Sequence, residues 1–180
     1  MAARSGMVVL IGRIRSMIGD PAGADQVFSD DEIQYAADVH RWEKRYAPLK
    51  GLVTYTNGVP GYLTWVAAEG NWESDAVLSD AQYGVLTPSG TDAINGRWTF
   101  AASQAAVYIT GWFYDLFGAA ADLLEAWAAK TASDFDFTAD GASFHRSQKG
   151  AALRVMAEEY RKKQRVHVIQ QERGDLRNDY

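Results

Sequence analysis

The sequence predicts an α+β protein: a mainly α-helical bundle with an inserted antiparallel β-rich subdomain. Apolar residues recur at helical spacing toward both ends of the 180-residue chain. Between residues 51 and 112, by contrast, there is no lysine, and this stretch holds eight glycines and four of the six tryptophans, which is typical of short strands and turns. The predicted units are the helical bundle at 1–50 and 111–170, the β-rich insert at 51–110, and a flexible tail at 171–180.

The N-terminal segment predicts two helices. Apolar residues place a first helix at 8–18, and Gly19-Asp20-Pro21 ends it because proline cannot continue the backbone ladder. Ser29 and Glu32 then have the spacing of a capping box, which predicts a second helix over residues 29–46 that stops before Pro48. His40 falls on the apolar stripe of this helix and is interpreted as a core residue.

The middle segment predicts one small antiparallel sheet of four to six strands. Asn57-Gly58 is a strong signal for a tight turn, since both residues tolerate a positive φ. Apolar, aromatic and β-branched residues give the expected strands, which are 52–56, 62–67, 71–78, 84–87, 96–100 and 106–110.

The C-terminal segment predicts two further helices. Residues 114–130 carry two adjacent apolar stripes with only a narrow acidic strip, so this helix should be covered on most sides. Residues 134–141 are expected to form an aspartate-rich loop. A last helix is expected over 147–171, and its apolar stripe gives way to basic residues after Arg161.

Composition excludes several kinds of chemistry. The chain has no cysteine, which rules out disulfides, thiolate metal sites and cysteine nucleophiles, and it has three histidines. The net charge is −5, yet residues 146–180 hold nine Lys/Arg against five Asp/Glu. An acidic body with a basic arm indicates docking on an acidic partner, contact with nucleic acid, or a solvated helix face. Because no secretory or membrane-spanning segment is recognised, an intracellular protein is expected.

A search for catalytic motifs predicts no enzyme, no cofactor and no catalytic or metal-binding residue. Asp134, Asp136 and Asp140 lack the spacing of a calcium loop. Glu69, Glu73 and Asp75 could supply the pair of carboxylates that glycoside hydrolysis needs, with nearby tryptophans as sugar-binding platforms. Such acid pairs also occur by chance in an acidic chain. The tryptophans are interpreted as core residues or interface anchors.

Residues 110–130, TGWFYDLFGAAADLLEAWAAK, resemble the central helix of head–tail connector (adaptor) proteins of long-tailed bacteriophages. The following DFTADG at 136–141 and FHRSQ at 144–148 resemble the turn and helix start of that family. So does the SDDEI start at 29–33. The resemblance covers the two ends of the chain, and the β-rich middle departs from the compact all-helical members.

The resemblance implies a structural virion protein rather than an enzyme. Connectors form a ring, usually of twelve copies, that docks under the portal protein, extends the DNA channel and joins the head to the tail. The implied partners are copies of the chain, the portal protein and the next neck or tail protein (a tail terminator or stopper). Genomic DNA passes through the lumen without sequence-specific binding, and no membrane takes part. The implied location is the virion neck, after assembly in the host cytoplasm.

Two sets of residues are predicted to make these contacts. The basic end of the last helix and the tail are the portal-docking candidates, and these are Arg161, Lys162, Lys163, Arg165, Val168, Ile169, Arg173, Leu176, Arg177 and Tyr180. Five tryptophans are the subunit-interface candidates, and these are Trp65, Trp72, Trp98, Trp112 and Trp127. The alternative for the tryptophans of the insert is that they fill its own small core.

Two other functions stay open at this point. A DNA-contacting accessory protein would use the basic C-terminal helix, because Lys and Arg release counterions when they bind phosphates. A small hydrolase or sugar-binding module would need a concave acidic site.

Overall fold

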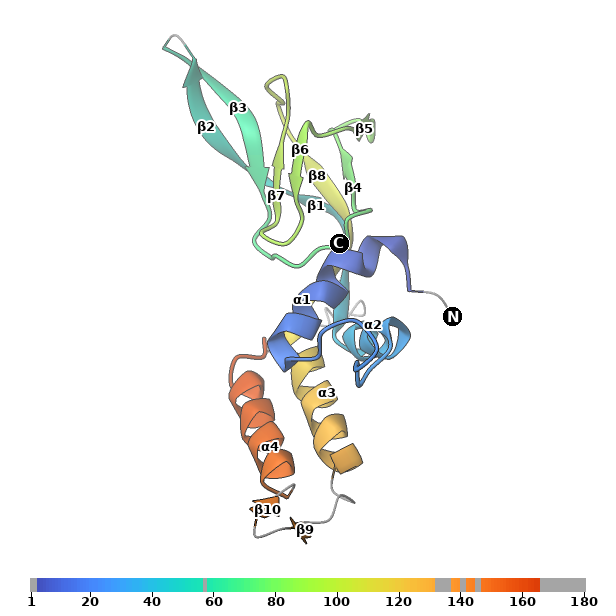
Figure 1. Ribbon diagram of the computed structural model, residues 1–180. Helices are drawn as coiled ribbons and strands as arrows, with labels where there is room; N and C mark the ends of the chain where they lie inside the picture. Colours follow the sequence, from blue (N-terminus) through green and yellow to red (C-terminus); the bar gives the residue numbers. More distant parts are fainter. Residues whose placement is uncertain (1–2, 57, 132–136, 140–141, 145–146, 166–180) are drawn as a thin grey trace, which may run out of the picture.

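The computed structural model describes residues 3–56, 58–131, 137–139, 142–144 and 147–165. Over these residues, four α-helices occupy one half of an elongated molecule and two four-stranded sheets occupy the other (Figure 1). Each half has its own core. Buried residues such as Leu10, Ile33 and Leu124 fill the helical core, and Trp72 and Trp98 are among those that fill the sheet core.

Helix α1 (Val8–Ile18) follows a short 3₁₀ turn (Ser5–Met7) and has the predicted bounds. Its apolar side chains at Leu10, Ile14 and Ile18 are buried. The helix ends at Gly19, which adopts φ 71° and donates its N–H to Arg15 O. Glycine reaches this left-handed conformation without steric cost, so the predicted stop signal is confirmed.

Helix α2 (Asp30–Val39) begins at the predicted capping box. The Glu32 N–H donates to Ser29 Oγ at 3.3 Å, and the Ser29 N–H donates to Glu32 Oε2 at 2.7 Å. The predicted end at residue 46 is wrong, because the chain leaves the helix at His40 and continues as strand β1 (Arg41–Pro48).

Strand β1 forms because its side chains alternate and a partner strand is present. Exposed and half-buried residues alternate from Arg41 to Tyr46, which is the period of a strand and not of a helix. β1 pairs antiparallel with β8 (Tyr108–Tyr114), with Arg41 opposite Tyr114 and Pro48 opposite Tyr108. The register shifts between Lys44 and Ala47, where Tyr46 has φ 49°.

The first sheet has the strand order β1-β8-β4-β5, with β4 at Val77–Ser79 and β5 at Val85–Leu86. Strand β8 runs four residues past the predicted end and includes Tyr114, which was expected to start a helix. Trp72 lies in a predicted strand but makes only an isolated bridge with Phe113.

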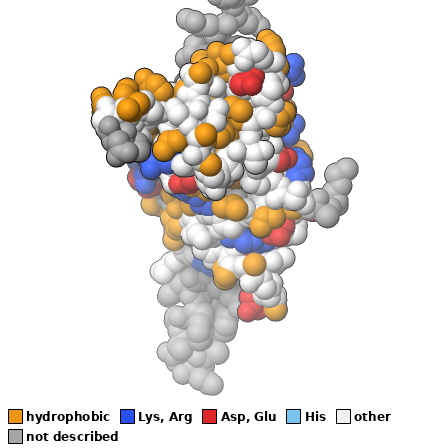
Figure 2. All heavy atoms as spheres, turned by 90° about the horizontal axis from the view of Figure 1, so that it is seen from above, with side chains coloured by type: hydrophobic (Ala, Val, Ile, Leu, Met, Phe, Trp, Pro, Cys, Tyr) orange, Lys and Arg blue, Asp and Glu red, His pale blue; other side chains and the backbone are white. Residues whose placement is uncertain are grey.

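The second sheet has the order β2-β3-β7-β6. Its strands are β2 (Lys50–Thr56), β3 (Val59–Val66), β6 (Gly90–Asp92) and β7 (Arg97–Thr99). The predicted turn after β2 is present as a tight connection, with Thr56 opposite Val59 and Gly58 at φ 78°. Seen from above, hydrophobic side chains gather on the part of this sheet that projects at the left (Figure 2).

Helix α3 (Leu116–Thr131) packs against α1, α2 and α4 (Ser147–Arg161). Asp115 caps it, since Asp115 Oδ1 accepts the Phe117 N–H at 3.0 Å. A two-stranded hairpin of β9 (Phe137–Ala139) and β10 (Ala142–Phe144) stands where a loop was expected. Helix α4 ends at Arg161, and residues 162–165 form a turn and irregular backbone, so the predicted continuation of the last helix to residue 171 is wrong. The predicted tail at 171–180 lies outside the described residues.

The mainly helical bundle is therefore a wrong prediction. The protein is α+β, and two separate four-stranded antiparallel sheets accompany its helices. The first sheet draws β1 from residues expected to be helical and extends β8 past residue 110. The reason is physical: pairing with the distant strand β8 satisfies the backbone groups along one edge of residues 41–48, and the alternation of side chains favours the sheet.

Replacing Ser29 with alanine is expected to lower the free energy of unfolding by about 1 kcal/mol, because the first turn of α2 loses its cap. Hydrogen bonds from Ser29 also lower the pKa of Glu32. A carboxylate with a lowered pKa stabilises the fold near neutral pH and loses this contribution as the pH falls through that pKa. Urea unfolding at pH 7 and pH 3.5 should show a smaller difference for Ser29→Ala than for the wild type. Ser29→Thr, which keeps the hydroxyl, should behave as the wild type, and an equal loss in both variants would contradict the assignment.

Candidate functional site

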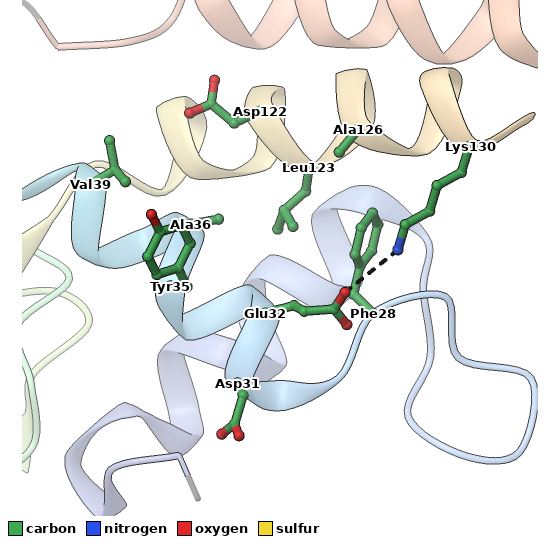
Figure 3. A pocket seen from close by; sticks show the side chains of 10 residues that line it. All are labelled: Phe28, Asp31, Glu32, Tyr35, Ala36, Val39, Asp122, Leu123, Ala126 and Lys130. Atoms are coloured by element: carbon green, nitrogen blue, oxygen red, sulfur yellow. Dashed lines mark ion pairs between the residues drawn. The ribbon is translucent and has the colours of Figure 1, made fainter. Parts of the chain in front are cut away.

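An apolar groove lies between α2 and α3 in the described part of the chain. It has a volume of about 470 Å³. Phe28, Ala36, Leu123 and Ala126 form its apolar walls, as Figure 3 shows. At its α2 side, Tyr35 is 75% exposed although its ring is large. An opening of this kind suits an apolar side chain of a protein partner better than a small polar substrate.

Charged side chains surround the groove. Asp31, Glu32 and Asp122 give three carboxylates, and Lys130 is the lysine among the lining residues. Lys130 Nζ lies 3.6 Å from Glu32 Oε1 and 4.3 Å from the centre of the Phe28 ring (Figure 3). An apolar floor with a largely acidic rim favours a partner segment that carries apolar and basic residues.

The acidic strip of α3 binds the ends of α2 and α4. His40 Nε2 lies 2.7 Å from Asp122 Oδ2, and Arg161 Nη2 donates to Asp122 Oδ1 at 3.1 Å and to Glu125 Oε2 at 2.8 Å. The hydrogen bond with Glu125 is the largest cause of a raised pKa of Arg161, and the contact with Asp122 raises it further. His40 was expected in a core stripe, and it instead ends α2 and ties it to α3.

The portal-docking candidates in the described part of the chain are held by contacts within the chain. Arg161 binds α3, and Lys162 Nζ donates to Glu159 at 2.7 Å. Lys163 lies about 6 Å from the rings of Phe117 and Tyr160, and the Arg165 N–H donates to Asp115 Oδ2 at 2.8 Å. The remaining candidates lie outside the described residues, and these are Val168, Ile169, Arg173, Leu176, Arg177 and Tyr180.

The five interface tryptophans divide into two groups. Trp65, Trp72 and Trp98 are at most 6% exposed and lie in the sheet core of their own chain. Trp112 and Trp127 are half-buried, with the Arg41 guanidinium 4.4 Å above the first ring and Lys149 Nζ 4.8 Å from the second. Only the second group leaves part of its rings accessible to a neighbouring molecule.

Two of the three carboxylates that admit a hydrolytic role, Glu69 and Glu73, make structural contacts, and the third, Asp75, is exposed. Glu69 pairs with Lys44, and Glu73 accepts hydrogen bonds from Arg4 at 2.8 Å and from Tyr114 Oη at 2.7 Å. Asp134, Asp136 and Asp140, considered for calcium, lie outside the described residues. The residues that the structure describes contain no cluster of three or more His, Asp or Glu able to hold a metal ion.

Sequence reasoning missed the partly buried network around Arg4. Its guanidinium donates to Asp38 at 2.6 Å, to Glu73 and to Tyr114 Oη at 2.9 Å. Hydrogen bonds with the two carboxylates raise the pKa of Arg4, and burial and Glu73 raise the pKa of Tyr114, so its hydroxyl stays protonated and donates. The partners lie 34, 69 and 110 residues from Arg4, so no local pattern signals the network.

None of the described helices has both the length and the apolar content needed to span a bilayer. Comparison of the chain with protein-family models, curated proteins and solved structures gives no match. The resemblance to phage connectors therefore stays a prediction.

Proposed function

We propose that this chain is a head–tail connector (adaptor) of a tailed bacteriophage, a structural protein that assembles as a ring under the portal and joins the head to the tail. The residues at 29–33, 110–130, 136–141 and 144–148 that resemble this family are the sequence support for the proposal. The observation that carries it is apolar surface left open at separate places. The groove between α2 and α3 and the projecting β2–β3 strands both expose large apolar side chains.

The arrangement of charge also favours assembly over catalysis. Carboxylates in both halves of the molecule bind side chains of the same chain. Glu32 and Asp122 pair with Lys130 and Arg161, and Glu69 and Glu73 bind Lys44 and Tyr114. Each such pair fixes one element against another. In a ring, every subunit uses one surface to bind its neighbour and a different surface to receive the next, and rotation closes the assembly.

Attachment to the portal is tested by co-sedimentation of the full chain with its cognate purified portal protein. In the proposal, the tail docks against the portal, so deletion of residues 171–180 should abolish attachment. The double variant Arg173→Ala/Arg177→Ala should weaken it about tenfold, which corresponds to about 1.4 kcal/mol. Arg13→Ala/Arg154→Ala removes the same charge from exposed positions on α1 and α4 and should leave attachment unchanged. Unchanged attachment of the deletion variant would refute tail docking.

The alternative of a DNA-contacting protein is less well supported by the basic end of α4. Arg161 and Lys162 there bind carboxylates of their own chain, which reduces the positive charge offered to phosphates. A connector that only surrounds DNA should show no steep salt dependence of duplex binding in gel shifts. Tight binding that falls sharply between 50 and 200 mM salt would favour the alternative.

A further inference from the structure

The β2–β3 hairpin projects beyond the sheet to which it belongs (Figure 1). Strand β3 pairs with β7 only at Thr64, Trp65 and Val66, whereas its pairing with β2 continues to Val59. The outer part, residues 53–56 and 58–62, is therefore a two-stranded arm that no third strand joins among the described residues. At its base, the Tyr62 N–H donates to Ser103 Oγ and the Gln104 N–H donates to the Tyr62 carbonyl oxygen. Isolated two-stranded hairpins are only marginally stable in water, so such an arm gains from a partner.

One face of this arm is apolar. Val53 pairs with Tyr62, and Tyr55 pairs with Pro60, and cross-strand partners at alternate positions share a face. Tyr55 is 71% exposed, Val53 50% and Tyr62 40%. Residues 51–68 contain no charged residue, so the arm lacks the charges with which soluble proteins usually protect an exposed edge.

A second exposed apolar surface, here called the tyrosine patch, lies on the outer face of the first sheet. It consists of Tyr46, Val77, Tyr83, Val85 and Tyr108. The Tyr46 ring is stacked between Tyr83 at 4.3 Å and Tyr108 at 4.1 Å, which makes the patch rigid. Tyr83 and Val85 are 73% and 75% exposed, and Val77 is 46% exposed.

The turn beside the tyrosine patch is held together by hydrogen bonds to the Asp80 carboxylate. Asp80 Oδ1 accepts the N–H groups of Gln82 at 2.9 Å and Gly84 at 2.7 Å. Tyr46 Oη donates to the Asp80 carbonyl oxygen at 2.8 Å. These hydrogen bonds hold the turn beside the patch in place and satisfy one oxygen of the Asp80 carboxylate.

We propose that the apolar face of the β2–β3 arm of one copy packs on the tyrosine patch of the next copy. The arm and the β4–β5 side of the molecule lie on opposite sides of the sheet half (Figure 1), as a head-to-tail contact requires. Neither the arm face nor the tyrosine patch includes a charged residue. Arg45, next to Tyr46, is 78% exposed and is paired with Glu43 at 2.9 Å, so it lies beside the patch as part of an ion pair. The exposed Tyr and Val side chains of the two surfaces offer on the order of 800 Å² together, about half of the total area that a standard interface buries.

Complementation of two variants by sedimentation velocity tests this contact in the full chain. The arm variant is Val53→Thr/Tyr55→Ser, and the patch variant is Tyr83→Ser/Val85→Thr. Each should lose the self-association of the wild type, and an equimolar mixture should form dimers but nothing larger, because only one intact interface is left per pair. Val8→Thr/Val155→Thr is the matched control, since these residues are 65% and 61% exposed but lie on α1 and α4, away from the arm, the patch and the α2–α3 groove. It should associate as the wild type does.

Three results would overturn the proposal. A patch variant that associates normally would mean that arm pairs with arm or with a different surface. Equal loss in the helix control would mean that removal of any exposed apolar side chain weakens association, and that the arm and the patch are not its specific surfaces. A wild-type chain that stays monomeric up to about 1 mM would exclude an affinity of biological use.

Cysteine trapping identifies the contact directly, because the chain has no native cysteine. A mixture of Tyr55→Cys and Val85→Cys chains should form disulfide-linked dimers under mild oxidation, and Tyr55→Cys alone should not. Dimers of Tyr55→Cys alone would instead show a symmetric arm–arm contact.

The inference rests on the proposed function only in assigning the contact to a ring. These experiments use the chain alone, so they fail independently of the portal assay. Self-association through the arm without portal attachment would refute the connector role and keep the contact. Portal attachment of the wild type, together with normal self-association of the arm and patch variants, would keep the connector role and refute the contact.

Discussion

Asp20→Ala is expected to lower the free energy of unfolding by about 3–5 kcal/mol, the usual cost of removing one partner from a buried ion pair. Asp20 is 1% exposed and binds the Arg15 guanidinium at 3.1 Å. It also accepts the backbone N–H groups of Val27 at 2.7 Å and Phe28 at 3.0 Å. The variant leaves a buried cation with fewer partners and two buried N–H groups without an acceptor. Urea unfolding followed by circular dichroism measures the loss.

Asp25→Ala is the matched control, because Asp25 lies in the same connection between α1 and α2 but is exposed. Its effect should stay within about 0.5 kcal/mol. Asp20→Asn should fall between the two, since the amide oxygen can still accept one backbone N–H. Similar losses for Asp20→Ala and Asp25→Ala would show that the buried network does not hold this connection.

Trp72→Ala is expected to cost about 3–5 kcal/mol, because it empties the centre of the sheet core. Trp72 is 1% exposed, with its ring 5.2 Å from Phe113 and 6.2 Å from Trp98. Its Nε1–H donates to the Glu69 carbonyl oxygen at 2.8 Å, so the tryptophan also fixes the chain after β3. Thermal unfolding should show a large fall in the melting temperature of the isolated protein.

Trp112→Ala is the comparison for this prediction, since Trp112 is only half-buried and lies on the opposite face of β8 from Phe113. It should cost clearly less stability than Trp72→Ala. The role of Trp72 as an interface anchor makes a different prediction: normal unfolding but defective self-association. Observation of that pattern would contradict its assignment to the core.

The predicted helix ends are correct where a short local sequence pattern indicates a single structure. Apolar spacing and Gly19 gave both ends of α1, and Ser29 with Glu32 gave the start of α2. For residues 40–46 the predicted continuation of the helix is wrong, because exposed and half-buried side chains alternate there as in a strand. The structure has a strand there because residues 108–114, about seventy positions away, supply its partner.

The functional surfaces were less predictable for the same reason. The tryptophans are predicted as core residues or interface anchors, and three of them are buried in the sheet core of their own chain, whereas the most exposed aromatic side chains are tyrosines. Tyr46, Tyr83 and Tyr108 stack only because β1, the β4–β5 turn and β8 meet in one sheet. Side chains so far apart in sequence leave no local pattern.

The sequence by itself determined the helix caps, the tight turn after β2, the absence of thiol chemistry and the uncharged character of residues 51–68. These properties depend on residues within a few positions of one another, and local backbone preferences are enough to set them. Only the tertiary structure decided that β1 is a strand, that Arg4 binds Asp38 and Glu73, and which aromatic rings stay exposed. Strand pairing and burial arise from contacts between distant segments, whose free energy outweighs the local preference of any one of them.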